Sequence, residues 1–212
     1  IATGAKWRRD GVSRQHVVPF PTDAAMPVFT PDDLMDDAPP TGHVVIYDDD
    51  HYYMGGVMAE LLIQKGCAVT LMTPAAYVSE WTINTLEQHE IHRRLANMGV
   101  NIELNRGVTA IGKDHVETNC MFTDIKRPME CDGVLLVSSR AENNTVYHDL
   151  KAREAEWADS GIKSVKLIGD ANAPGPIAWA TYAGHRYARE LDGEDMGDAL
   201  PFRREITQLA FD

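Results

Sequence analysis

An α/β fold is predicted by three features of the sequence. From Gly42 onwards, short apolar runs typical of strands alternate with segments of helical composition. The first run, at 44–47, is apolar throughout, which is typical of a buried parallel strand. A hairpin pattern precedes the last strand of the series. Together these features indicate a three-layer, Rossmann-like domain of the nucleotide-binding type at about 42–140.

The elements of this domain follow in a regular order. After the strand at 44–47, Gly55 and Gly56 lead into a helix, and the next strand completes a βαβ unit. Asn84 and Glu87 are placed to form a capping box at the start of the second helix. The further elements that we expect are a helix at 57–65, a strand at 68–72, a helix at 83–98, a strand at 100–104, a hairpin at 108–111 and 115–122, and a strand at 133–138.

The two ends of the chain have a different pattern. Residues 5–40 are rich in proline and carry acidic clusters, which predicts a long connecting segment rather than regular structure. A disordered tail is the alternative, but several apolar residues favour packing on a surface: Val17, Val18, Phe20, Met26, Val28, Phe29 and Leu34. Towards the other end, helices at 151–158 and 177–191 flank a short apolar strand at 165–168.

Composition excludes several classes of protein. The 212 residues are 44% hydrophobic and 25% charged, with a net charge of −12 from 32 acidic and 20 basic residues. This excess of acid argues against binding to nucleic acid or to an anionic membrane, and no apolar run is long enough for a transmembrane helix. Three scattered cysteines cannot form a disulfide framework or a four-cysteine iron–sulfur site and fit a cytoplasmic setting. The chain begins at Ile1 without a methionine, so we expect it to be part of a longer protein.

Three motifs occur in an informative order. They are Ala2-Thr3-Gly4, the loop at 48–56, and Gly169-Asp170 followed by a helix. Each is weak alone. Together they resemble the C-terminal third of the trimethylamine, dimethylamine and histamine dehydrogenases, over essentially the whole chain. The stretches that carry this resemblance are Ile1-Ala-Thr-Gly-Ala-Lys-Trp7, Asp48-Asp-Asp-His-Tyr-Tyr-Met-Gly-Gly56, Asn84-Thr-Leu-Glu87, Gly169-Asp-Ala-Asn-Ala-Pro174 and Ala183-Gly-His-Arg186.

The resemblance implies a domain plan. Residues 1–41 would hold the end of one half of an FAD-type domain and a connector, and 42–150 would be an inserted NAD(P)H-type domain. Residues 151–212 would return to complete the FAD-type domain. Such enzymes carry FMN on an N-terminal TIM barrel and a 4Fe–4S cluster, pass electrons to an electron-transferring flavoprotein and form homodimers. The residues for amine oxidation, FMN attachment and the cluster would lie upstream of Ile1.

The resemblance also places a nucleotide, ADP or FAD, at the FAD-type domain. Asp170 is the strongest candidate contact, followed by Gly169, Thr3 and Gly4, with a structural helix-capping role as the alternative for Asp170. We assign no catalytic residue and no metal ligand in this chain. We expect the chain alone to be colourless, to bind no flavin or cluster, and to oxidise no amine.

The loop at 48–56 lacks the glycine pattern of a dinucleotide-binding loop. Such a loop uses glycines so that the backbone can approach the pyrophosphate, but Asp48, Asp49 and Asp50 stand in their place. A carboxylate about 4 Å from a phosphate charge costs about 4 kcal/mol at an effective dielectric constant of about 20. Thr73-Pro74 follows the second strand where an acid for the ribose is usual. We therefore expect no NAD(P)H in the usual pose.

Other interpretations of this region are weaker. Asp48–His51 offers oxygen ligands for Mg²⁺ or Ca²⁺ but lacks calcium-loop spacing, so a solvent-exposed acidic turn at the helix start is favoured. His89 and His92 share a helix face, which more often is solvated than zinc-binding. Tyr52, Tyr53 and Met54 are more often core or interface residues.

Two rival functions stay open. One is a 2,4-dienoyl-CoA reductase-like module that uses FAD and NAD(P)H, which requires a working pyridine-nucleotide loop at 48–56. The other is a non-catalytic binding or docking module that uses its acidic surface.

Overall fold

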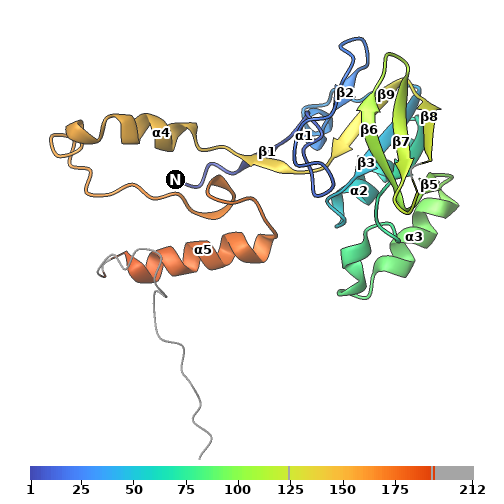
Figure 1. Ribbon diagram of the computed structural model, residues 1–212. Coiled ribbons are helices and arrows are strands. Elements are labelled where there is room, and N and C mark those ends of the chain that lie inside the picture. The colour runs from blue at the N-terminus through green and yellow to red at the C-terminus, as the bar shows by residue number, and fades with distance from the viewer. Residues whose placement is uncertain (124, 192, 194–212) are drawn as a thin grey trace, which may run out of the picture. The chain divides into compact units, whose positions relative to one another are not determined.

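The computed structural model describes residues 1–123, 125–191 and 193, and it divides into two compact units (Figure 1). The first, which we call the α/β unit, is Lys6–Ala141. The second, the terminal unit, combines Ile1–Ala5 with the chain from Glu142 onwards. The observed division differs from the predicted ranges, because residues 6–41 belong to the α/β unit and residues 142–150 to the terminal unit.

A five-stranded parallel sheet forms the centre of the α/β unit. Its middle strand is β3, whose continuous apolar run pairs with β4 on one side and with β9 on the other. The prediction of a buried parallel strand is confirmed, because β3 has a parallel neighbour on each side. The strand order is β2 (Val28–Phe29), β9 (Gly133–Val137), β3 (His43–Asp48), β4 (Ala68–Met72) and β5 (Asn101–Glu103).

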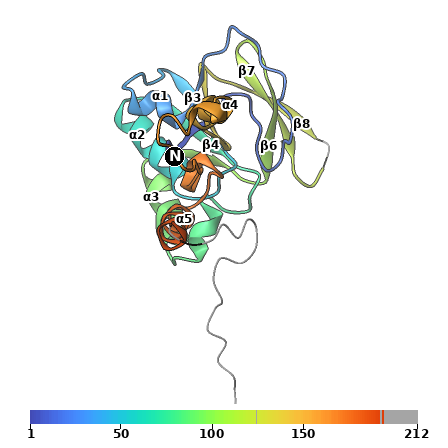
Figure 2. The same ribbon diagram turned by 90° about the vertical axis from the view of Figure 1, so that its left-hand side faces the viewer.

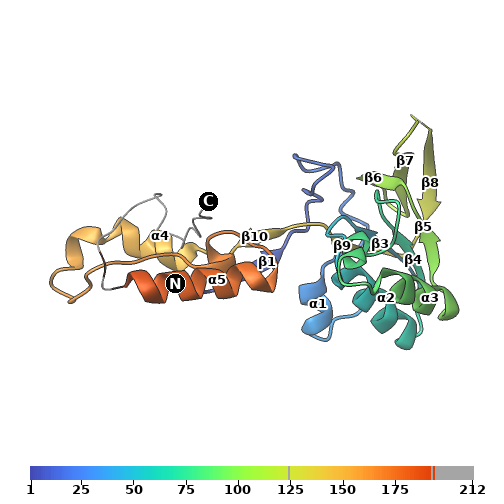
Figure 3. The same ribbon diagram turned by 90° about the horizontal axis from the view of Figure 1, so that it is seen from below.

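Three layers are built on this sheet (Figures 2 and 3). Side chains alternate along β3, so that Val44 and Ile46 pack in the core on the helical face, while Val45 and Tyr47 pack in the core on the opposite face. This arrangement confirms the predicted α/β fold. The helices of one face are α1 (Pro31–Met35), α2 (Met54–Gln64) and α3 (Gln88–Asn97), and the antiparallel sheet of the other face is β6 (Arg106–Ile111), β7 (His115–Cys120) and β8 (Lys126–Glu130).

The connecting segment contributes to the core of the α/β unit. Phe20, Met26 and Leu34 are buried, and β2 adds an edge strand to the parallel sheet. The prediction of a packed connector is therefore confirmed for these residues. It is wrong for Val17 and Val18, which are 85% and 65% exposed.

The second helix begins later than predicted. A 3₁₀ turn, η1 (Glu80–Ile83), comes first, and Leu86 has a left-handed backbone with φ +63°, which interrupts regular helix. The predicted capping box of Asn84 and Glu87 is wrong, because Glu87 is itself the residue before α3 and its carboxylate accepts a hydrogen bond from the Tyr53 hydroxyl. The end of the helix near Gly99 agrees with the prediction.

The terminal unit is mainly helical where it is described. The predicted helix at 177–191 is observed as α5 (Ile177–Glu190). The helix predicted at 151–158 lies earlier, as α4 (Thr145–Ala152), followed by the 3₁₀ turn η2 (Glu154–Glu156). No strand forms at 165–168, although Ile168 N–H donates to the Ile1 carbonyl at 3.0 Å. Strands β1 (Ala5–Trp7) and β10 (Arg140–Glu142) pair where the chain crosses between units. No helix among the described residues is long and apolar enough to cross a membrane.

The three free cysteines differ in thiol chemistry. Burial raises the pKa of Cys131 to about 11 and also raises that of Cys67. Hydrogen bonds, led by one from Thr123, lower the pKa of Cys120, which is only half-buried. Because the thiolate is the reactive form, we expect a disulfide reagent at neutral pH to label Cys120 at least about tenfold faster than the other two. Cys120→Ser should remove the fast phase, and equal rates for the three thiols would contradict this order.

Candidate functional site

The carboxyl ends of β3 and β9 mark the place where ligands bind in this kind of sheet. The chain runs from β3 outwards to β4 and β5 on one side and returns through β9 on the other, with Asp48 paired to Val137. Open α/β sheets hold ligands in the crevice outside such a switch point. The loop that follows β3 is therefore the first candidate site.

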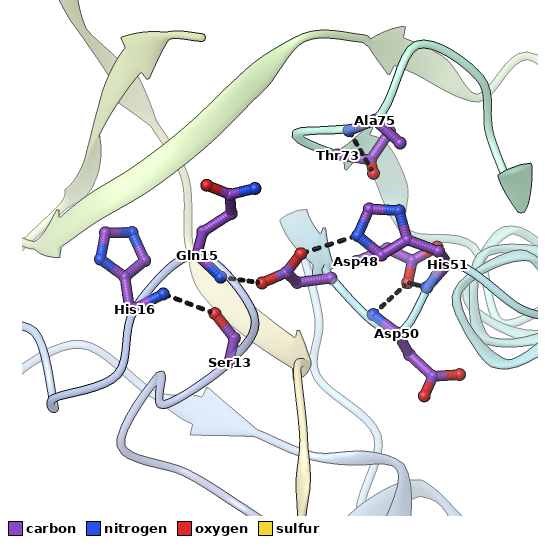
Figure 4. Close-up of polar contacts among 9 residues, drawn as sticks. Ser13, Gln15, His16, Asp48, Asp50, His51, Thr73 and Ala75 are labelled. Atoms are coloured by element: carbon purple, nitrogen blue, oxygen red, sulfur yellow. Dashed lines mark hydrogen bonds and ion pairs between the residues drawn. The ribbon is translucent and has the colours of Figure 1, made fainter. Parts of the chain in front are cut away.

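This loop folds back onto the end of β9. The backbone N–H groups of Asp49 and Asp50 both donate to the Val137 carbonyl, at 3.0 and 3.1 Å. The Asp48 carboxylate accepts from the N–H groups of Asp50 and His51 at 3.2 and 3.1 Å (Figure 4). Asp48 and Asp49 have no exposed surface. The predicted solvent-exposed acidic turn is thus wrong for Asp48 and Asp49, which are buried, and the Asp48 carboxylate accepts from the backbone of the turn itself.

Asp49 joins the loop to a distant part of the chain. Its Oδ1 lies 2.7 Å from His51 Nε2, and its Oδ2 accepts from Gln15 N–H at 2.9 Å. Gln15 lies in residues 11–16, which we call the strap. Burial opposes ionisation of Asp49, but hydrogen bonds, led by that of His51, hold its pKa below the usual value. Burial likewise opposes the His51 charge, yet Asp49 and Asp48 raise its pKa overall. The geometry therefore fits a buried ion pair.

Asp48 has a different environment. Burial raises its pKa to about 7, and its Oδ2 has no hydrogen-bond partner among the described residues. This carboxylate lies against Gly55 in the first turn of α2, where a Cβ would come within 2.3 Å of Oδ2. Gly55 is thus required for the Asp48 side chain rather than for a ligand.

The crevice does not fit the NAD(P)H that a domain of this type implies. The strap crosses the ends of the strands, because Asp49 holds Gln15 and the Ser139 hydroxyl donates to the Val12 carbonyl at 2.5 Å. The Asp48 side chain occupies the space next to Gly55 of α2. Thr73 is buried after β4, where it accepts from Ala75 N–H at 3.2 Å. A pyrophosphate needs accessible backbone N–H groups at the start of the helix. Here carboxylates and the strap occupy that space.

In the terminal unit, the first residues of the chain form hydrogen bonds with backbone groups of later segments. The Ile1 amino group donates to the Lys166 carbonyl at 2.7 Å. The Thr3 hydroxyl donates to the Asn143 carbonyl, and Asn143 N–H donates to the Gly4 carbonyl at 2.9 Å. Thr3 and Gly4, both predicted to contact a cofactor, therefore hold the chain segment at Asn143.

Gly169 and Asp170 open the 3₁₀ turn η3 (Gly169–Ala171). Gly169 has φ +61°, a conformation that favours glycine, and Asp170 Oδ1 accepts from Gly175 N–H at 3.2 Å. Asp170 thus orders the turn that precedes α5, but it does not cap that helix, whose N-cap residue is Pro176 and has no side-chain hydrogen bond.

A pocket of about 470 Å³ lies between residues 166–173 and α5. Of the four predicted cofactor residues, only Gly169 lines it. Two basic and two aromatic side chains that were not predicted as cofactor contacts also line it, together with the acidic Glu190: Lys166, Arg186, Trp179 and Tyr187. The helical spacing of Trp179, Arg186 and Tyr187 in the sequence was the available signal, because such residues share one face of α5.

Metal binding has no support among the described residues. No group of three or more histidine, cysteine, aspartate or glutamate side chains there is arranged to hold a metal ion. His89 is exposed and His92 half-exposed on α3, as expected for a solvated helix face.

These features define the chain as an α/β protein of the nucleotide-binding type, with a parallel sheet and a covering antiparallel sheet. The crevice at the sheet edge is occupied by the strap and by the Asp48 side chain. Residues 29–152 match the family described as the OYE-like second alpha/beta domain, and the chain belongs to that family.

Amine-oxidising proteins are similar to this chain along nearly its full length. Dimethylamine dehydrogenase of Hyphomicrobium sp. (strain x) is 34% identical over 97% of this chain and 31% of its own length. The structure of histamine dehydrogenase from Rhizobium sp. 4-9 is 62% identical with a TM-score of 0.93, over 99% of this chain and 33% of that one. That of 6-hydroxypseudooxynicotine amine oxidase from Pseudomonas geniculata N1 is 38% identical with a TM-score of 0.80, over 87% and 27%. The chain thus spans about a third of these relatives.

Proposed function

We propose that this chain is the C-terminal, nucleotide-binding-type region of an amine dehydrogenase that contains FMN and a 4Fe–4S cluster. The reaction of the whole enzyme would be oxidative cleavage of a methylated or primary amine, with the FMN as the group that accepts the electrons. The observation that carries the proposal is the 62% identity and TM-score of 0.93 to histamine dehydrogenase over 99% of the chain.

Within such an enzyme, the chain would support a nucleotide rather than perform catalysis. The pocket of the terminal unit has a volume of about 470 Å³, within the usual range for small-molecule sites. Trp179 and Tyr187 offer aromatic faces for a base. Lys166 and Arg186 offer positive charge for phosphates, and the Arg186 Nε also donates to Glu190, which lines the same pocket, at 2.8 Å. Gly175 leaves the space that the Trp179 ring occupies, since a Cβ there would lie 2.3 Å from the ring. These residues fit ADP, or the ADP half of FAD.

The partners of the whole enzyme follow from the same proposal. The three cysteines of this chain are fewer than a four-cysteine cluster needs. The cluster and the FMN would therefore be held by other parts of the enzyme. An electron-transferring flavoprotein would accept the electrons, the enzyme would be a homodimer, and it would be cytoplasmic.

Calorimetric titration of the 212-residue chain with ADP tests the nucleotide site. We expect saturable binding, and we expect Arg186→Ala to weaken it by about tenfold because a charge-assisted phosphate contact is lost. Arg189→Ala is the matched control, since Arg189 lies on the same helix, is exposed and does not line the pocket. Absence of ADP binding, or equal effects of the two variants, would count against this site.

A titration with NADPH in the same buffer separates the main rival. A dienoyl-CoA reductase-like module needs a working pyridine-nucleotide crevice, whereas we expect no saturable NADPH binding to the α/β unit. Stoichiometric NADPH binding that survives Arg186→Ala would favour the rival.

A further inference from the structure

The strap is held across the sheet edge by hydrogen bonds at both of its sides and by the Arg14 guanidinium, which lies over the Trp81 ring. At one side, the Ser139 hydroxyl after β9 donates to the Val12 carbonyl at 2.5 Å. At the other side, Gln15 N–H donates to Asp49 Oδ2 at 2.9 Å. Between them, Ser13 N–H donates to the His16 carbonyl at 2.8 Å and closes a small turn within the strap. Asp49 therefore attaches the strap to the loop after β3 through the Gln15 N–H and through the Ser13 side chain.

Asp49 in turn depends on His51. Asp49 is fully buried and His51 is 8% exposed, so neither charge is hydrated to a useful extent. Their 2.7 Å contact compensates both charges. The His51 backbone is fixed as well, since it has φ +64° and its carbonyl accepts from Trp81 N–H at 3.0 Å. The imidazole is thus held beside Asp49 and cannot easily turn away.

Other charged and titratable groups face this pair from each neighbouring element. Asp48 and Asp50 lie on the same loop: Asp48 acts on His51, Asp50 acts on both members of the pair, and Tyr47 of β3 lies close to Asp49. Arg14 of the strap, which lies over the Trp81 ring at 4.2 Å, acts on Asp50 and opposes the charge on His51, and Arg140 of β10 acts on Asp50. Without the imidazolium charge, the buried part of the loop would hold anionic groups alone.

We propose that the strap is a proton-controlled cover of the crevice: protonated His51 fixes Asp49, Asp49 fixes Gln15, and loss of the proton loosens residues 11–16 from the sheet edge. The inference concerns the α/β unit and does not depend on the amine dehydrogenase assignment.

The direction of the pH effect follows from three groups. The pKa of His51 is raised above its ordinary 6.5, so its contribution is complete below that value and is lost as the pH rises through the raised pKa. Asp48, with a pKa of about 7, ionises over a similar range, and its negative charge favours the proton on His51, so it moves the loss of that proton to higher pH. Asp49, whose pKa is lowered, weakens the contact only when the pH falls below its ordinary 3.8. The strap should therefore be most firmly held between about pH 4 and about pH 6.5.

Hydrogen exchange of the Gln15 amide tests the proposal on the full chain. After correction for intrinsic exchange rates, we expect its protection to fall by about tenfold between about pH 6 and about pH 8.5. The amide of Ile46, inside β3, serves as the internal reference and should not change. The ring nitrogen resonances of His51 should titrate over the same range as the protection of Gln15.

Two histidine variants separate this device from general titration of the protein. His51→Asn, chosen because asparagine tolerates a left-handed backbone, should make Gln15 protection low and independent of pH. His115→Gln is the matched control: His115 also has a raised pKa, from Asp114 and Glu117, but lies on β7 away from the strap. It should keep the wild-type pH dependence. If His51→Asn does not fold, Asp49→Asn provides the same test. Protection that is independent of pH in the wild type, or a pH dependence that survives in either loop variant, would overturn the proposal.

Discussion

Gly55→Ala is expected to destabilise the α/β unit by about 2–3 kcal/mol, at the upper end of the cost of overpacking a core. The new methyl group would lie 2.3 Å from Asp48 Oδ2, 2.5 Å from its Cγ and 2.9 Å from its Cβ. Asp48 cannot easily yield, because it is fully buried and its other oxygen accepts two backbone N–H groups. Urea denaturation followed by circular dichroism would measure the loss.

The neighbouring glycine provides the matched control. A Cβ at Gly56 would make ordinary contacts, the nearest at 3.5 Å to Ile91. Alanine is also the better helix former, so Gly56→Ala should leave stability unchanged or slightly raised. The clash with Asp48 predicts a further result: combining Gly55→Ala with Asp48→Gly should cost less than the sum of the two single changes. Equal losses at the two glycines, or strict additivity, would show that Asp48 does not fill this space.

Prediction from the sequence succeeded where the signal is local. The apolar run of β3 has the composition of a buried parallel strand, and α5 begins directly after Pro176, as a helix-starting proline indicates. Both signals lie within a few residues, so no knowledge of distant contacts was needed. The α/β fold followed from the order of such elements.

Prediction failed where a distant segment changes the environment of a residue. Aspartates are rarely buried, so the sequence favoured an exposed turn for Asp48 and Asp49. Their burial is possible because Gln15, 34 residues before Asp49, supplies a hydrogen bond, and because a histidine two residues away supplies charge. Similarly, Thr3 forms its contacts with Asn143, which is 140 residues away in the sequence. A tripeptide motif contains no information about such a partner.

The prediction of where α3 begins failed for another reason. The apolar spacing of residues 83–98 is helical, but Leu86 adopts a left-handed conformation and is 92% exposed. Periodicity reports which residues could share a face and does not detect a backbone that departs from the helix. Tertiary hydrogen bonds at Glu87 and Tyr53 then determine where the helix begins.

Asp49→Ala should have the largest effect of any single substitution in the α/β unit that we consider, a loss of about 3–5 kcal/mol. Removing one member of a buried ion pair leaves the other charge uncompensated, which costs more than the pair contributes. Here the truncation also leaves Gln15 N–H without its acceptor. Glu90→Ala is the control, because it breaks an ion pair with Arg93 on the exposed face of α3 and should cause no measurable change.

A double-mutant cycle identifies the source of this loss. If the uncompensated His51 charge dominates, Asp49→Ala combined with His51→Asn should be more stable than the sum of the single effects predicts, by at least about 1 kcal/mol. The loss from Asp49→Ala alone should also shrink at high pH, where His51 is neutral before the substitution is made. An additive cycle with a loss that does not change with pH would instead assign the effect to the lost packing and hydrogen bond of Asp49, and the charge on His51 would then have no role in holding the strap.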